Sequence, residues 1–346
     1  MNERNYNNID GLRTFGCLAI IAWHVLYNGN FYVGKYCSER LIPSFNYLVY
    51  MFMIISGFGM CNGYYHKFKT GKYDLNKYYS RRYQKIVPFF ALLIALNCAV
   101  DLKIETIYEG IIELTMLFGF LPNNTLNVIG VAWTLGVIFV FYIVFPFVVF
   151  LLDNKRRGWV SFVVSLGITY MCQVYFMTGE FVTNSFTMRH SFLFCLPYFL
   201  CGGLIYLYRN EISDFLNTHK RLSLICCMGL IIGYLVTPDK IGQIEIIVPK
   251  TLLVYSVCVC AALGENTPLL SNRFTNFISS ISMEMYLAHM IVFRIVEKLR
   301  IPKLLGNSIT GYCLTYVVVV ILLVLGLVLY RKVVNLVNVK GIKQKQ

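Results

Sequence analysis

The most conspicuous shortage in this sequence is of charge. Only 14% of its 346 residues are Asp, Glu, Lys or Arg, whereas 57% are hydrophobic, and a soluble domain usually has about one quarter charged residues. A soluble core could not hide so much apolar surface, and the charges lie in clusters between apolar runs long enough to cross a bilayer. The composition therefore excludes an ordinary soluble protein and predicts an all-α, polytopic integral membrane protein.

Acidic residues are the scarcer charged type, with 17 Asp and Glu against 31 Lys and Arg and a net charge of +14. In a soluble domain this excess would suggest nucleic-acid binding. In a membrane protein, cations in short loops fix the orientation and contact anionic lipid. We therefore expect membrane lipids, and no nucleic acid, among the partners.

Groups with metal-ligand spacing are also lacking. The chain has only five His, and most of its 12 Cys lie inside apolar runs with no His or carboxylate at metal spacing. Cys226, Cys227, Cys258 and Cys260 are examples, which we interpret as small reduced hydrophobic residues. We expect neither a metal site nor a disulfide framework.

Ten apolar runs match the length of a membrane span. The predicted spans are 12–30, 45–64, 86–102, 131–152, 159–177, 190–208, 222–237, 247–263, 277–297 and 311–330. Because 222–237 and 247–263 are short and interrupted by Pro or Lys, nine spans is the alternative. No long linker, internal repeat or low-complexity run appears, so the sequence predicts one membrane domain over 1–346, with its core at 9–330.

The orientation follows from the basic loop between Tyr65 and Lys85, in which Asp74 is the one acid. The positive-inside rule places this loop in the cytoplasm, and ten spans then put both termini there, including a basic tail at 331–346. By these boundaries the whole net positive charge falls on predicted cytoplasmic segments. No small-residue cleavage site follows the first apolar run, which indicates a retained helix. We expect a multi-pass protein of the plasma or inner membrane.

One segment between predicted spans is amphipathic. Glu105, Glu109 and Glu113 recur every four residues and form a charged stripe on an otherwise apolar helix. We expect this helix to lie in the outer interface or to dip into the protein.

Two ionisable residues on the first span suggest chemistry, because burying such groups in a bilayer is costly. Arg13 and His24 are eleven residues apart, which places them on one helical face about 16 Å apart along the axis. Arg13 alone is compatible with an interfacial anchor, and His24 with an interhelical hydrogen bond. Together they would line one cavity.

The segment from Ile9 to Arg13, followed by Ala19 and His24, resembles the opening helix of the acyltransferase-3 family of integral membrane enzymes, with its Arg-x10-His signature. Further matches follow in the family's order over nearly the whole chain: Phe52 with Ser56-Gly57-Phe58, Arg82-x-x-Lys85-x-x-Pro88, Trp133-Thr134-Leu135 with Tyr142 and Pro146, and Ser282-x-Glu284-x-Tyr286-Leu287-x-His289. Two positions depart from the pattern. Ile138 stands where many members have Glu, and Lys85 where many have a second Arg, which replaces a bidentate fork by a point charge.

The resemblance implies an O-acyltransferase, most often an O-acetyltransferase, that moves an acyl group from cytoplasmic acetyl-CoA to a hydroxyl of a surface or lipid-linked glycan. His24 would be the general base or an acyl-accepting relay. Arg82 and Lys85, with Arg81 in reserve, would bind the CoA phosphates. Arg13 would also bind the CoA phosphates or would orient the thioester.

The remaining motif residues have weaker assignments. Ser56, Gly57 and Phe58 would line the acyl tunnel or pack helices closely. Trp133 and Tyr142 would stack on a sugar or belong to an interfacial aromatic belt. The late segment would supply acceptor-side polar groups or a structural network, and consists of Glu284, Tyr286 and His289.

Two other classes of function remain open at this stage. A secondary transporter or proton-coupled carrier would also place Arg13 and His24 along a polar path, although no matched helix breaks appear in two halves of the chain. A relative that has lost catalysis is the third possibility, which Ile138 keeps open and the presence of Arg13 and His24 disfavours.

Overall fold

The computed structural model describes residues 6–71, 73–120, 128–178, 187–241 and 244–343, with side chains described up to Leu336. It is almost entirely helical, and its helices form two compact units. The larger unit contains residues up to Leu12 and Tyr47–Ser271, and the smaller contains Arg13–Asn46 and the residues from Asn272 onward. The helical fold class is therefore confirmed.

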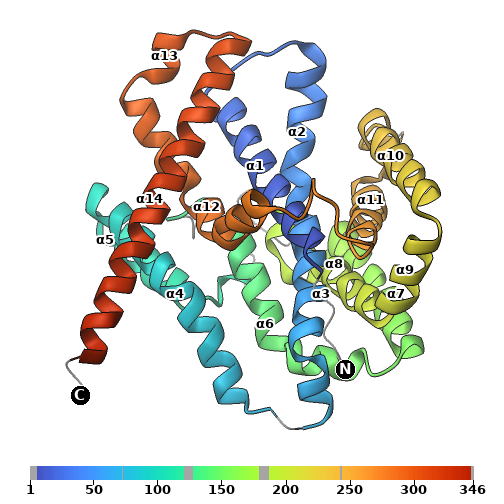
Figure 1. The fold of residues 1–346 in the computed structure, drawn as a ribbon. Helices are drawn as coiled ribbons and strands as arrows, with labels where there is room; N and C mark the ends of the chain where they lie inside the picture. Colours follow the sequence, from blue (N-terminus) through green and yellow to red (C-terminus); the bar gives the residue numbers. More distant parts are fainter. Residues whose placement is uncertain (1–5, 72, 121–127, 179–186, 242–243, 344–346) are drawn as a thin grey trace. The chain divides into compact units, whose positions relative to one another are not determined.

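The larger unit is built from nine α-helices and several short elements among the described residues. The α-helices are α3 Leu48–Lys69, α4 Leu75–Val100, α5 Ile104–Leu114, α6 Trp133–Leu151, α7 Lys155–Met171, α8 Phe192–Leu207, α9 Arg209–Thr218, α10 Lys220–Val236 and α11 Ile247–Ala261 (Figure 1). The short elements are the 3-10 turns η2 Phe45–Tyr47 (at the boundary of the units), η3 Phe118–Phe120 and η5 Met188–His190, the π-helix η4 Cys172–Phe176, and the antiparallel pair β1 Lys240–Ile241 and β2 Ile244–Glu245.

The smaller unit is built around three long helices. Its elements are α1 Asn8–Asn28, whose first turn belongs to the larger unit, η1 Cys37–Leu41, α2 Ile42–Ser44, α12 Arg273–Lys298, α13 Ile301–Leu305 and α14 Ile309–Lys343. The helix α14 continues unbroken past residue 330, so the predicted tail begins as helix, and 344–346 lie outside the described residues.

The chain is a multi-pass membrane protein. Six helical segments in the described part of the chain are long and apolar enough to span a membrane, or seven if the bent pair α8 and α9 forms one span. The outer face of α7 is apolar yet exposed, as at Val160, Val163 and Val164, which is expected of a surface that faces lipid. Every predicted span coincides with a helix, but α10 and α11 have only 17 and 15 residues. The count of ten spans stays a prediction.

One predicted boundary is wrong in a way that matters for function. The basic segment before residue 86 was expected to be a loop, but α4 begins at Leu75, where the Asp74 side chain accepts a hydrogen bond from the Asn76 backbone N–H. Arg82 and Lys85 therefore lie on a helix. Hydropathy ends a predicted span where charge begins, whereas a capped helix continues beyond the apolar run. The helix α9 also lies in a segment between two predicted spans, where a loop was expected.

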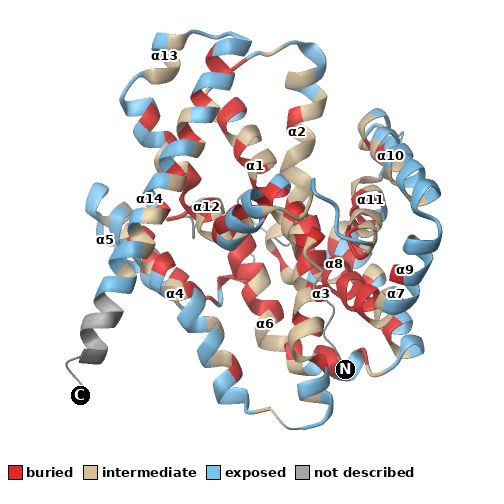
Figure 2. Cartoon of the chain, viewed as in Figure 1, coloured by how far each residue is buried: buried red, intermediate tan, exposed pale blue. Residues whose placement is uncertain are grey.

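Close packing of α3 against α8 forms the centre of the larger unit, where buried residues concentrate on α3, α6 and α8 (Figure 2). Gly57 of α3 lies directly against the backbone carbonyl of Phe199, and Gly202 of α8 lies against that of Ile54. Glycine allows two backbones to approach this closely because it has no Cβ. The packing interpretation of Gly57 therefore has direct structural support.

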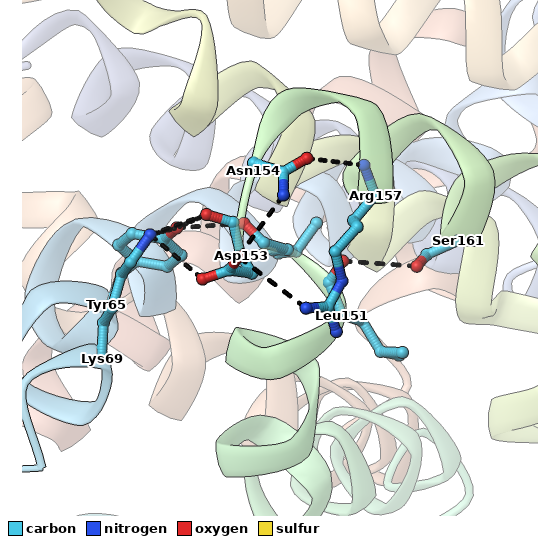
Figure 3. Close-up of polar contacts among 8 residues, drawn as sticks. Tyr65, Lys69, Leu151, Asp153, Asn154, Arg157 and Ser161 are labelled. Atoms are coloured by element: carbon cyan, nitrogen blue, oxygen red, sulfur yellow. Dashed lines mark hydrogen bonds and ion pairs between the residues drawn. The ribbon is translucent and has the colours of Figure 1, made fainter.

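A cluster of hydrogen bonds and ion pairs joins the end of α3 to the turn between α6 and α7 (Figure 3). The Tyr65 hydroxyl donates to the Leu152 carbonyl at 3.0 Å, and Lys69 Nζ donates to the Asp153 carbonyl at 2.7 Å. Asp153 also pairs with Lys69 and Arg157, and its hydrogen bond with the Lys69 ammonium lowers the pKa of the Asp153 carboxyl. This cluster of polar contacts fixes the last turns of α3 relative to α6.

The predicted amphipathic segment is the helix α5, and its third glutamate is buried. One carboxylate oxygen of Glu113 accepts the Val128 N–H at 2.8 Å, while the other is buried without a hydrogen-bond partner among the described residues. Burial raises the pKa of Glu113 to about 7, although the N–H groups of Val128 and Ile129 oppose this rise. The protein favours a neutral carboxyl at this position.

We expect the stability of the protein to fall as pH rises toward 7 because of Glu113. A pKa raised in the folded state gives stability that is complete below about pH 4.5 and is lost as pH passes the folded value near 7. The shift corresponds to about 3 kcal/mol. Glu113→Gln keeps an acceptor for Val128 but cannot titrate, so its unfolding midpoint in detergent should vary less between pH 5 and pH 8. Parallel curves for the two proteins would contradict this assignment.

Candidate functional site

The smaller unit places two imidazole rings against each other. His24 lies near the end of α1 and His289 lies on α12, with ring centroids 4.7 Å apart and ring planes 51° apart. His24 is half-buried, whereas His289 is 1% exposed. These residues are 265 positions apart in the sequence, and the fold brings them together.

The hydrogen bonds of α1 hold His24 in this position. The Thr14 hydroxyl donates to the Thr275 carbonyl of α12 at 2.7 Å, and the Tyr312 hydroxyl of α14 donates to the Ala22 carbonyl at 3.0 Å. The helix α1 is thus fixed to both neighbours, with one contact only two residues from His24. Arg13 is half-buried on the same continuous helix, as its predicted relation to His24 requires.

The chemistry of His289 follows from its contacts. Its Nδ1 lies 2.6 Å from the Tyr286 carbonyl oxygen, which can only accept a hydrogen bond. Nδ1 is therefore the protonated nitrogen, and Nε2 carries a lone pair. Nε2 is buried and has no hydrogen-bond partner within the described residues. The structure thus holds a buried proton acceptor on a ring that contacts His24.

Glu284 and Tyr286 have other contacts on α12. The Glu284 carboxylate pairs with Arg331 of α14 at 3.0 Å, and Arg331 also donates to the Ser280 carbonyl at 2.6 Å. These contacts fit the structural-network alternative for Glu284. Tyr286 contributes its backbone carbonyl to His289.

In the larger unit, Arg82 is enclosed by tyrosine rings. Its guanidinium carbon lies 4.7 Å from the ring centroid of Tyr64, 5.6 Å from that of Tyr78 and 5.0 Å from that of Tyr142. We call these four residues the Arg82 cage. The Tyr78 hydroxyl donates to the Tyr142 carbonyl at 2.8 Å, which ties α4 to α6. The cage brings together two predicted site residues, Arg82 and Tyr142.

Arg82 makes no ion pair with any described carboxylate, and its Nε is buried without a hydrogen-bond partner in this part of the chain. A half-buried guanidinium without a counter-charge is costly unless a ligand supplies the anion. Arg81 and Lys85 are exposed on the same helix, and Arg81 donates to the Tyr73 hydroxyl at 3.1 Å. The cage therefore has the donor chemistry to bind a phosphate.

The other predicted residues in the larger unit lie apart from this cage. Phe58 is buried and packs edge-on against Tyr6 at 5.3 Å, while Ser56 is half-buried on α3. Trp133 begins α6 and stacks on His190 at 4.6 Å, so that one indole face is already covered. These contacts favour packing over a tunnel lining for Phe58.

No role for Tyr64, Tyr78, Arg189 or His190 was predictable from the motifs. Tyrosines are too frequent in this chain, with 25 copies, for the cage to be predictable. Arg189 did carry a signal, because arginine is less common on the side that the positive-inside rule predicts to be external. The signal for His190 was that a histidine stands at the start of a predicted span.

Comparison with known protein families supports an enzymatic function. A family model described as an acyltransferase domain matches residues 6–330. The match includes both imidazoles, the Arg82 cage and all the motif residues. No curated protein and no solved structure shows a significant match to the chain.

Proposed function

Because the chain belongs to the acyltransferase-3 family and is therefore a membrane acyltransferase, we propose that it transfers an acetyl group from acetyl-CoA to a saccharide hydroxyl. The acceptor is a cell-surface or lipid-linked glycan, and the enzyme acts in the plasma or inner membrane. The observation that carries this proposal is the pair of His24 and His289, because it supplies a base and a neighbouring proton acceptor.

His24 is the general base of the proposed reaction. It takes the proton of the acceptor hydroxyl while that oxygen attacks the thioester carbonyl. The new C–O bond forms, the C–S bond breaks, and the proton passes from the imidazolium to the leaving CoA thiolate. A relay in which His24 itself carries the acetyl group would use the same residue as a nucleophile.

His289 is proposed as a positioning residue. Its ring lies against that of His24, and its Nε2 would accept an N–H from His24, which would leave the other His24 nitrogen unprotonated for the hydroxyl. The Tyr286 carbonyl fixes the His289 tautomer in turn. This chain of contacts resembles the base-and-orienter arrangement of other acyl-transfer enzymes.

Arg82 is the proposed main contact with the CoA phosphates, supported by Lys85, Arg81 and Arg13. Among them Arg82 has the clearest physical reason to bind an anion, because its Nε is buried and unpaired among the described residues. Arg81 and Lys85 are exposed and would add long-range attraction. The cage tyrosines hold the plane of the Arg82 guanidinium. Its N–H donors therefore lose little conformational entropy when phosphate binds.

Removal of the Arg82 charge is expected to weaken donor binding. Arg82→Gln should raise the KM for acetyl-CoA about 10- to 100-fold, because hydrogen bonds to charged groups contribute about 1.5–3 kcal/mol. The measurement is thiol release from acetyl-CoA by purified protein, with saccharide acceptor present. Arg156→Gln removes an exposed charge from α7 and should leave KM unchanged.

The same assay tests the proposed function itself. Wild-type protein that binds acetyl-CoA but never releases thiol would support the carrier alternative. A normal KM in folded Arg82→Gln protein would place the donor site elsewhere.

A further inference from the structure

A second arginine in the larger unit pairs with no carboxylate among the described residues. Arg189 lies in η5, and its guanidinium carbon is 5.0 Å from the ring centroid of Trp133. It pairs with no described carboxylate, and its Nε is buried with no hydrogen-bond partner among the residues that the structure describes. Partial burial of an unpaired cation costs free energy unless an anion pairs with it.

Aromatic side chains surround this cation. The His190 and Trp133 rings are stacked with planes 20° apart. We call Arg189, Trp133 and His190 the Arg189 site. It combines a fork of N–H donors with flat apolar surfaces.

The Arg189 site is separate from the Arg82 cage. On α6, Trp133 and Tyr142 are nine residues apart, or about 14 Å. Arg189 therefore lies beside the first residue of α6, whereas the Arg82 cage lies beside the middle of that helix. Arg189 lies at the end that the charge pattern predicts to be external, where an acceptor glycan would arrive.

We propose that the Arg189 site binds an anionic group carried by the saccharide acceptor. The guanidinium pairs with a carboxylate or phosphate of the sugar. This inference rests on the proposed function for the identity of the acceptor. A phospholipid headgroup is disfavoured, because arginines that meet headgroups extend their guanidinium into the interface, whereas the Nε of Arg189 is buried.

The test is direct binding to full-length protein in nanodiscs of neutral phosphatidylcholine. Cellobiouronate and cellobiose differ in a single carboxylate, and glucose 6-phosphate and glucose differ in a phosphate. Saturation-transfer NMR should show that wild-type protein binds at least one acidic member at least tenfold more tightly than its neutral partner. A tenfold preference corresponds to about 1.4 kcal/mol.

Arg189→Gln should abolish this preference, and Arg189→Lys should retain part of it. The matched control is Arg209→Gln, because Arg209 is also stacked on an aromatic ring, that of Tyr206 at 4.1 Å, but donates to the Tyr206 carbonyl. This control should keep the acidic preference of the wild type.

Equal affinity of wild-type protein for acidic and neutral sugars would overturn the inference, even if Arg189→Gln did not fold. In a second set of nanodiscs that also contain phosphatidylglycerol, loss of bound phosphatidylglycerol in Arg189→Gln, with unchanged sugar binding, would also overturn it in favour of a lipid site. Thiol release from acetyl-CoA by the wild type is measured in parallel. Its absence alongside an intact acidic preference would contradict the proposed function and leave the Arg189 site standing.

Discussion

Replacement of His24 by alanine is expected to lower the turnover of acetyl transfer by about 10² to 10⁴-fold, the usual contribution of a general base. The ring lies against His289 on a helix that α12 and α14 hold in place, so its loss should remove chemistry more than structure. The measurement is kcat for acceptor acetylation, normalised to the amount of monodisperse protein in detergent. The KM for acetyl-CoA should change little.

Two further variants sharpen this prediction. His66→Ala changes an exposed histidine at the end of α3 and should keep wild-type turnover. His289→Leu should lower kcat less than His24→Ala and should shift the pH at which kcat is half-maximal, because it removes the acceptor that is proposed to set the His24 tautomer. Full activity of folded His24→Ala protein would refute the assignment of the base.

A single methyl group at Gly57 is expected to destabilise the protein by at least about 3 kcal/mol. The added Cβ would collide with the backbone carbonyl of Phe199, and no rotamer change can move a backbone atom. The two helices must therefore separate along the tightest contact of the larger unit. The measurement is the fraction of monodisperse protein after heating in detergent.

The same helix provides the control. Gly63 also lies on α3, but no atom lies within 4 Å of a Cβ added there, so Gly63→Ala should behave as the wild type or slightly better. Gly202→Ala on α8 should repeat the loss, because its Cβ would meet the Ile54 carbonyl. Equal midpoints for Gly57→Ala and Gly63→Ala would show that α3 and α8 do not require this close approach.

Much of the fold was predictable from the sequence because apolar runs and helices share a length scale set by the bilayer. Each predicted span coincides with a helix. The errors occur at the ends, as with α4, because hydropathy responds to charge and a helix end responds to capping by residues such as Asp74. The buried state of Glu113 was left open, since a stripe of glutamates looks the same in water and against protein.

The candidate site was only partly predictable. The motifs indicated Arg13, His24 and Arg82, because costly charges in a membrane protein stand out in sequence. The partners of these residues did not stand out. The tyrosines of the Arg82 cage come from three helices, and the chain has 25 tyrosines that look alike in sequence.

The sequence alone determined that the chain crosses a membrane, where most of its helices lie, and to which family it belongs. These properties depend on local composition, period and motif order. Only the tertiary structure determined that the His289 ring lies against His24, that three tyrosines enclose Arg82 and that Arg189 lies beside Trp133 without an ion pair to any described carboxylate. The physical reason is that periodicity fixes which face of a helix is buried, whereas helix packing selects the distant residue that this face meets.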